Sequence, residues 1–295
     1  IGYQSLYTNT TGRLNVAIGV SALYTNSDGM SNTAIGYNSL YSNSTGGNNT
    51  AIGYRSLNMN TSGFNNVAIG QSALYNNFTG KNNTAIGQEC LVFNTGNDNT
   101  AIGCQSLYTN TTGTKNTAIG YQSLYNSIAD KNTAIGYQSL YTNTTGLDNV
   151  AMGSLSSYLN LTGNYNVGLG HYTLSTNSVG NNNTAVGHSS LFNNIDSNNT
   201  AIGYMASFTN TAGNDNTAIG MNALYTNSLG DTNTAIGNRA LYKNLGASNI
   251  AIGYEAVMLN SNGHDNLGIG NNCMLKNIGG HNNICIGNSS NVSGA

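Results

Sequence analysis

The chain lacks many of the residues on which ordinary globular proteins depend. Its 295 residues include no proline and no tryptophan, and only 6% of them are charged. The formal net charge of −2 provides no basic surface of the kind that binds nucleic acid or anionic lipid. No apolar run approaches the ~20 residues of a membrane-spanning helix. We therefore expect no contact with nucleic acid and none with a membrane in this segment.

Sequence signatures of catalysis are missing as well. The chain shows no serine–histidine–aspartate set, no paired carboxylates and no phosphate-binding loop, so we predict that it is not an enzyme and has no cofactor. Its four cysteines, which include Cys104, are not spaced as C-x-x-C. We expect Cys90, Cys273 and Cys285 to be buried free thiols, with a Cys273–Cys285 disulfide as the alternative.

The chain consists instead of one repeat of about 17 residues. A glycine that usually follows Ala-Ile recurs from Gly2 to Gly287; thirteen of the seventeen spacings are 17 residues and four are 16. Such a period is the signature of a repeat architecture. We expect residues 1–295 to be a single repeat array, a fragment of a longer fibre protein.

Two columns of asparagine frame the repeat. The second column follows the first at a constant distance of 11 residues, and Ser127 is its only substitution. Stacked asparagine side chains hydrogen-bond along parallel strands, so we predict that both columns are structural ladders. The first column lies four residues before the glycine, at Asn15, Asn32, Asn49, Asn66, Asn83, Asn99, Asn116, Asn132, Asn149, Asn166, Asn183, Asn199, Asn216, Asn233, Asn249, Asn266 and Asn283. The second lies seven residues after it and includes Asn9, Asn26, Asn43, Asn60, Asn77, Asn94, Asn110 and Asn143.

The residues before the glycine have the chemistry of a β-strand. Polar or β-branched residues alternate with alanine, as in Thr33-Ala34-Ile35, with a period of two. Stretches such as Thr144-Thr145-Gly146 have the composition of turns, and no window has the 3.6-residue period of a helix. We predict an all-β parallel β-solenoid (β-roll) of about 17–18 coils, with 16–17 residues and two short strands per coil.

The two faces of this strand carry different residues. We expect the isoleucines to form the core, at Ile18, Ile35, Ile52, Ile69, Ile86, Ile102, Ile119 and Ile135. The alanine column on the opposite face never holds a large residue, which suggests that another backbone packs against it. We infer a homo-oligomer, with the chain's own second strand as the alternative neighbour; the interface candidates include Ala17, Ala34, Ala51, Ala68 and Ala85.

The string Asn-Thr-Ala-Ile-Gly-Tyr, followed by Ser-Leu or Ala-Leu, resembles the head repeats of YadA-like trimeric autotransporter adhesins. It is also similar to repeats of phage tail fibres. The resemblance covers essentially the whole chain and implies a left-handed β-roll, three chains around an axis, and a place on a cell surface or a virion fibre. The repeat is longer than the usual adhesin head repeat, which leaves a larger ring or a filament open.

These observations predict a structural and adhesive role. The chain would act as a stiff, multivalent spacer that attaches to cells or surfaces through a cell-surface or glycan receptor. A phage tail-fibre shaft that binds a host receptor is one alternative. An ice-binding solenoid is another, although Val16, Val150, Ile250 and Leu267 interrupt the threonine column that an ice-binding face requires.

Three further sets of residues are weaker candidates for sites. His171 and His188 share a column in adjacent copies, as do His264 and His281, but two histidines without a third ligand are poor evidence of a metal. Calcium in the turns is conceivable at a column with several aspartates, yet that column also holds lysines: Asp98, Asp148, Asp215 and Asp265, against Lys115 and Lys131. Glycosylation sequons begin at Asn9, Asn43 and Asn110, although the asparagine persists where the sequon is broken.

Overall fold

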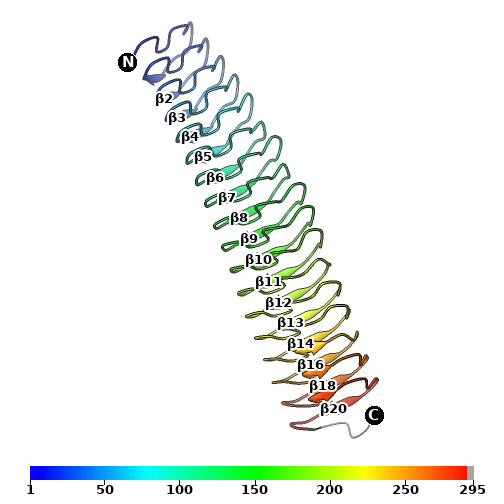
Figure 1. Cartoon of the computed structure of the whole chain (residues 1–295). Coiled ribbons are helices and arrows are strands. Elements are labelled where there is room, and N and C mark those ends of the chain that lie inside the picture. The colour runs from blue at the N-terminus through cyan, green and yellow to red at the C-terminus, as the bar shows by residue number, and fades with distance from the viewer. Residues whose placement is uncertain (291–295) are drawn as a thin grey trace. The chain divides into compact units, whose positions relative to one another are not determined.

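The computed structural model describes residues 1–290 and divides into two compact units, Ile1–Asp148 and Asn149–Ala295. Each unit is a stack of coils joined by parallel strands, and no helix occurs within the described residues (Figure 1). The predicted all-β parallel solenoid is therefore confirmed in both units.

In each unit, successive coils contribute one three-residue strand each to a parallel wall. In the first unit these strands are β1 (Val16–Ile18), β2 (Thr33–Ile35), β3 (Thr50–Ile52), β4 (Val67–Ile69), β5 (Thr84–Ile86), β6 (Thr100–Ile102), β7 (Thr117–Ile119) and β8 (Thr133–Ile135). In the second they are β9 (Val150–Met152), β10 (Val167–Leu169), β11 (Thr184–Val186), β12 (Thr200–Ile202), β13 (Thr217–Ile219), β14 (Thr234–Ile236), β16 (Ile250–Ile252), β18 (Leu267–Ile269) and β20 (Ile284–Ile286).

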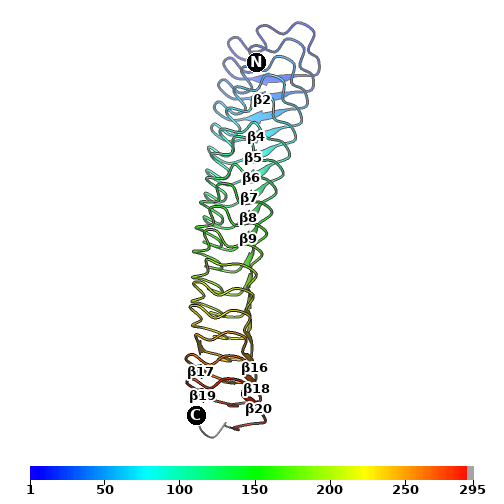
Figure 2. The same ribbon diagram turned by 90° about the vertical axis from the view of Figure 1, so that its right-hand side faces the viewer.

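The second wall of each coil is built mainly from stacked turns. It becomes regular near the end of the second unit, where β15 (Lys243–Asn244), β17 (Leu259–Asn260) and β19 (Lys276–Asn277) pair in parallel. Figure 2 shows β17 and β19 on the wall opposite β16, β18 and β20. The second strand of the coil thus exists, but it is two residues long.

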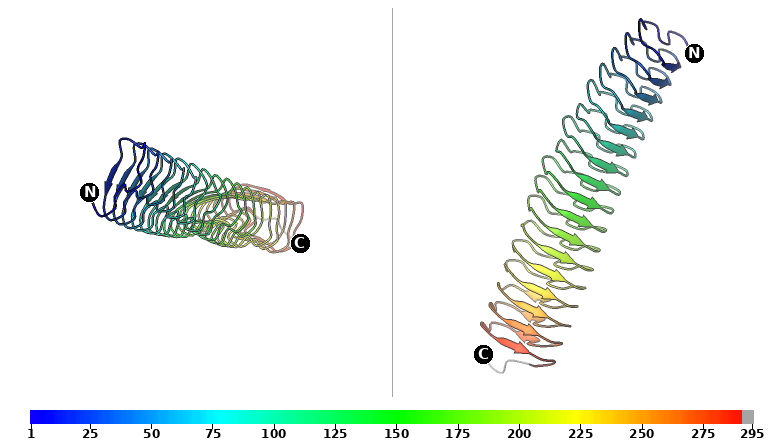
Figure 3. Two further views of the ribbon diagram at one scale, coloured as in Figure 1. Left: turned by 90° about the horizontal axis from the view of Figure 1, so that it is seen from above. Right: turned by 180° about the vertical axis from the view of Figure 1, so that it is seen from behind.

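Identical residues lie over one another from coil to coil. Ala51 of β3 is the register partner of Ala34 in β2 and of Ala68 in β4. The flanking isoleucines pair in the same way, and Thr50 pairs with Thr33 on one side and Val67 on the other. The strands of each unit lie side by side with their directions aligned (Figure 3). This in-register stacking follows from the constant part of the repeat, and the 16-residue copies keep it because they lose a residue only in the turn.

The predicted isoleucine core is wrong, because the strand presents its opposite face to the interior. Alanine is the inward residue, and all five interface candidates are buried inside their own chain: Ala17, Ala34, Ala51, Ala68 and Ala85. The isoleucines point outward; Ile18 and Ile86 are exposed, and the others are half-buried: Ile35, Ile52, Ile69, Ile102, Ile119 and Ile135. The restriction to small residues therefore reflects the chain's own second wall, which lies too close for a larger side chain.

Leucine from the second wall fills the interior opposite the alanine. Leu23, Leu40 and Leu57 are fully buried, and their φ angles are 53°, 50° and 48°. A left-handed backbone costs a residue with a Cβ roughly 1–2 kcal/mol, and burial of a leucine side chain recovers about 1.5–3 kcal/mol. Burial of the leucine side chain thus offsets the free-energy cost of the left-handed backbone that turns it inward.

The motif glycine occupies the corner between the two walls. Gly36 has a φ of 132°, and a Cβ on it would lie 2.5 Å from the carbonyl oxygen of Gly53 in the next coil. Any other residue at this corner would push the coils apart, which explains why the glycine recurs in every copy.

Candidate functional site

The first asparagine column joins successive coils through side chain and backbone together. The backbone N–H of Asn49 donates to Oδ1 of Asn32 at 3.0 Å, and Nδ2 of Asn49 donates to the carbonyl of Gly63 at 2.9 Å. The column is buried throughout except at its ends, where Asn15 and Asn283 are half-buried. The predicted ladder is present. It differs from the prediction in that most hydrogen bonds between successive coils run from a backbone N–H to an asparagine Oδ1.

The second column is a ladder of amides. Nδ2 of Asn43 donates to Oδ1 of Asn26 at 2.7 Å, and Nδ2 of Asn60 donates to Oδ1 of Asn43 at 2.8 Å. These side chains are buried, apart from the half-buried Asn9 in the first copy. The stacked asparagine ladder predicted for this column is confirmed.

Both columns converge on one carbonyl in each coil. The oxygen of Gly46 accepts from Nδ2 of Asn32 at 2.8 Å and from Nδ2 of Asn43 at 2.9 Å. A buried carbonyl in a turn needs such partners because no water reaches it. The shared acceptor gives a physical reason for the constant 11-residue distance between the two columns.

Ser127 breaks the second ladder. Its shorter side chain does not replace the missing amide, so Oδ1 of Asn110 is buried without a hydrogen-bond partner. Nδ2 of Asn143 in the following coil instead donates to Oγ of Ser127 at 3.3 Å. Asn94 lies in another 16-residue copy and keeps both ladder contacts, so the shortened coil itself does not require serine.

The sequons of the second column lie within this ladder. The amides of Asn43 and Asn110 are completely buried and donate to neighbouring coils. A glycan on either nitrogen would remove those bonds and would find no space in the folded coil.

The candidate metal ligands form pairs only. The ring centroids of His264 and His281 lie 3.8 Å apart, and the backbone N–H of His264 donates to Nδ1 of His281 at 3.1 Å. The rings of His171 and His188 are 5.2 Å apart. Within residues 1–290 no three His, Cys, Asp or Glu side chains gather in a geometry that could hold a metal ion.

The aspartate column follows the turn edge and does not form a cluster. Lys131 stands next to Asp148 with 4.0 Å between Nζ and Oδ1, so the column pairs a cation with an aspartate at this point. Asp98 instead accepts a hydrogen bond from Nδ2 of Asn82 at 2.9 Å. These contacts are those of solvated turn residues.

The cysteines are inside the coils. Cys273 and Cys285 form a disulfide between adjacent copies, with 6.2 Å between their Cα atoms, so the expectation of free thiols is wrong for this pair. Cys90 is a buried free thiol, and burial raises its pKa to about 12. Cys104 is free and half-buried.

The outward face of the strand wall is a stripe of threonine and aliphatic side chains in each unit. In the first unit Ile18 is 40% exposed and Ile86 36%; in the second, Ile202 is 40% and Ile252 37% exposed. The stripe repeats at every coil and carries no charged residue on the strands themselves. An exposed column of this kind is a candidate interaction surface.

A second surface feature is a column of aromatic rings, five residues after the motif glycine. Tyr7, Tyr24 and Tyr41 stack with centroid distances of 5.2 and 4.9 Å, and Tyr108 stacks on Tyr125 at 5.1 Å. This stack was not among the features predicted from the sequence. The recurrence of tyrosine at a fixed column was the signal that could have identified it.

Comparison with known proteins identified no relative of this chain. The chain matches no family model, no curated protein and no solved structure. In the described residues there is also no helix of the length and apolarity that a membrane crossing demands.

Proposed function

We propose that this chain is a structural and adhesive segment of an extracellular fibre, in which identical chains pack through the threonine–isoleucine stripe. The observation that carries the proposal is the partial exposure of an isoleucine in nearly every coil. A monomer would leave this regular apolar stripe in water, whereas burying the part of each isoleucine that is still exposed, 40% at Ile18 and Ile202, would contribute roughly 0.5–1 kcal/mol. Because the stripe repeats at every coil within each unit, a copy of the same stripe is a complementary partner.

A trimer is the favoured assembly, and a larger ring or a filament uses the same contact. Each unit of the chain presents one apolar strand wall, and three such walls, one from each chain, close around an axis without leaving one open. Within a unit, bonds such as that from the N–H of Thr50 to the carbonyl of Asn66, at 2.8 Å, link every coil to the next. Assembly of such stacks produces a stiff spacer on a cell surface or a virion fibre, and its repeated turns suit multivalent attachment.

Native mass measurement of the purified chain tests this proposal. We expect a trimer or higher oligomer for the wild type and dissociation for the double variant Ile52→Asp/Ile69→Asp, which places two carboxylates on the stripe. The matched control is Tyr37→Asp/Tyr54→Asp, which adds the same charge at exposed rings outside the stripe. A wild type that is monomeric at all concentrations, or a control that dissociates as readily, would contradict the packing.

Ice binding is a second candidate, because the threonines share the outward face with the isoleucines instead of being turned inward. Thr33, Thr50 and Thr84 are each half-buried at the same strand position. Thermal hysteresis in a solution of the wild type would favour this role. Its absence, together with a stable oligomer, would favour the fibre.

A further inference from the structure

The aromatic column of the first unit is interrupted at Asn58 and again at Val92. Only the interruption at Val92 leaves an apolar side chain between two rings. The residues at this position in three successive coils are Tyr75, Val92 and Tyr108, so one ring is missing between two others. Consecutive rings elsewhere in the column lie about 5 Å apart, such as Tyr108 and Tyr125 at 5.1 Å. The gap therefore spans two coil steps, or about 9.5 Å, which leaves room for one ring at van der Waals distance from both sides.

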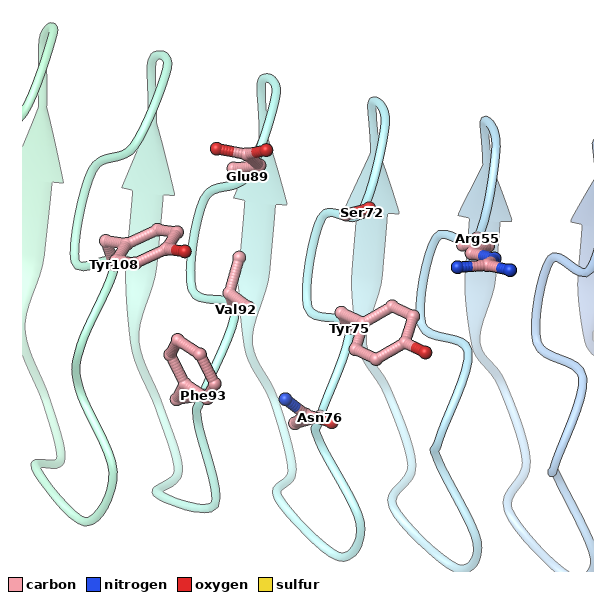
Figure 4. Close-up of a pocket in the computed structure, with 8 residues that line it drawn as sticks. All are labelled: Arg55, Ser72, Tyr75, Asn76, Glu89, Val92, Phe93 and Tyr108. Carbon is pink, nitrogen blue, oxygen red and sulfur yellow. The ribbon is translucent and has the colours of Figure 1, made fainter.

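The structure has a cavity at this gap. Its volume is about 300 Å³, and Figure 4 shows Val92 between Tyr75 and Tyr108, with Phe93 beside them. Phe93 packs edge-on against Tyr108, with 5.5 Å between the ring centroids. Val92 is almost fully buried at 7% exposure and forms an apolar floor.

Polar groups line the other side of the same cavity. Arg55, Ser72 and Glu89 occupy one column in three successive coils, whereas Asn76 lies at the opposite end, in the column of Phe93 (Figure 4). Ser72 is too short to fill the space between the two charged residues. Arg55 forms no ion pair within residues 1–290, and its guanidinium lies 5.2 Å from the ring centroid of Tyr54.

A chain of glutamine amides holds Glu89 in place. Nε2 of Gln138 donates to Gln122 at 2.8 Å, Gln122 donates to Gln105 at 2.8 Å, and Gln105 donates to Oε2 of Glu89 at 2.9 Å. In each of the three bonds the donor is the residue farther from Glu89, so the chain of amides ends with a donor on the carboxylate. Oε1 of Glu89 accepts no donor from the described part of the chain, so it remains available to a ligand.

We propose that this cavity binds one neutral pyranose ring of a glycan. A sugar ring has an apolar face of C–H groups that packs on aromatic rings and an edge of hydroxyls that donate and accept hydrogen bonds. The apolar side of the cavity fits that face, and Glu89, Asn76 and Arg55 supply an acceptor, an amide and donors for the hydroxyls. A purely aromatic ligand would leave this polar side without partners. The proposal deepens the adhesive function proposed above and rests on it.

The residue Val92 itself provides the test. Val92→Tyr restores the usual residue of the column, so it fills the gap without disturbing the fold. Ser175→Tyr is the matched control, because Ser175 interrupts the same column in the second unit. Binding is measured by saturation-transfer NMR with the methyl pyranosides of glucose, galactose, mannose and N-acetylglucosamine at millimolar concentration.

We expect at least one of these sugars to bind the wild type and the Ser175→Tyr variant, and we expect Val92→Tyr to lose the signal. Glu89→Gln should weaken binding roughly tenfold while it keeps the amide chain. No transfer to any of the sugars, or transfer that survives Val92→Tyr, would overturn the proposal, as would binding of a planar dye in the gap with no sugar bound. Because the cavity lies within one chain, native mass and sugar binding report separately on the fibre and on this site.

Discussion

Replacing Asn60 by aspartate perturbs the second ladder with almost no change in shape. The fully buried side chain of Asn60 donates to Oδ1 of Asn43 at 2.8 Å and to the carbonyl of Gly63 at 3.1 Å, and it accepts from Asn77 at 3.1 Å. Asn60→Asp keeps the Oδ1 that accepts from Asn77. It replaces the Nδ2 donor by an oxygen that faces Oδ1 of Asn43 and the carbonyl oxygen of Gly63. The variant therefore removes two hydrogen bonds and buries a charge without a partner.

We expect Asn60→Asp to lower the free energy of unfolding of its coils by roughly 3–5 kcal/mol at pH 7. Burial favours the neutral form, so the pKa of the introduced carboxyl rises above the ~3.9 of an exposed aspartate. At a pH between ~3.9 and the raised pKa, the introduced carboxyl is protonated in the folded state and ionised in the unfolded state. Stability should therefore fall as the pH rises from about 4 through the raised pKa, and part of the loss should be recovered below pH 4.

Amide hydrogen exchange is the suitable assay, because long repeat arrays do not unfold as a single two-state unit. The backbone N–H of Thr61 donates to the carbonyl of Phe78 at 2.9 Å and reports on the affected coils. Asn48→Asp is the matched control: Asn48 is exposed, and its column naturally holds Asp98 and Asp148. The control should change stability by less than about 0.5 kcal/mol. Equal protection in the two variants at pH 7, or a loss that does not depend on pH, would refute the role assigned to the ladder.

Three other perturbations test the interior. Ser127→Asn should donate to the unpartnered Oδ1 of Asn110 and stabilise the neighbouring coils by about 1 kcal/mol, seen as a higher melting temperature. Ala68→Leu should destabilise by about 1–3 kcal/mol in urea titration, because the alanine faces a filled interior; a neutral result would place it outside. Burial raises the pKa of Cys90 to about 12, so its thiol stays protonated at pH 8, and iodoacetamide should modify it only after unfolding. Mass spectrometry should show that the half-buried Cys104 reacts earlier; equal rates in the folded protein would contradict the burial of Cys90.

Several features of the fold could be predicted from the sequence because each requires one residue type at a fixed position of every repeat. The asparagine ladders were predictable since a buried amide that bonds to its own copy above and below tolerates few replacements. The column that contains Asn48, Asn65 and Asp98 could also be interpreted from the sequence. Asparagine and aspartate are frequent in it, and these residues tolerate a left-handed backbone. The φ angles of the three residues are 56°, 57° and 60°. The left-handed leucines had no such signal, because leucine rarely adopts that conformation.

The sequence by itself determined the period, the register and the identity of the stacked residues, since repetition forces each residue to meet its own copy in the next coil. It did not determine which face of the strand is inside. A period of two says only that Ala51 and Ile52 point in opposite directions, and hydrophobicity favours isoleucine for the core. Only the tertiary structure shows that the two walls lie close enough for alanine and one leucine to fill the space between them. The isoleucines are consequently on the outside, where the interface between chains that we propose would give a physical reason for their presence.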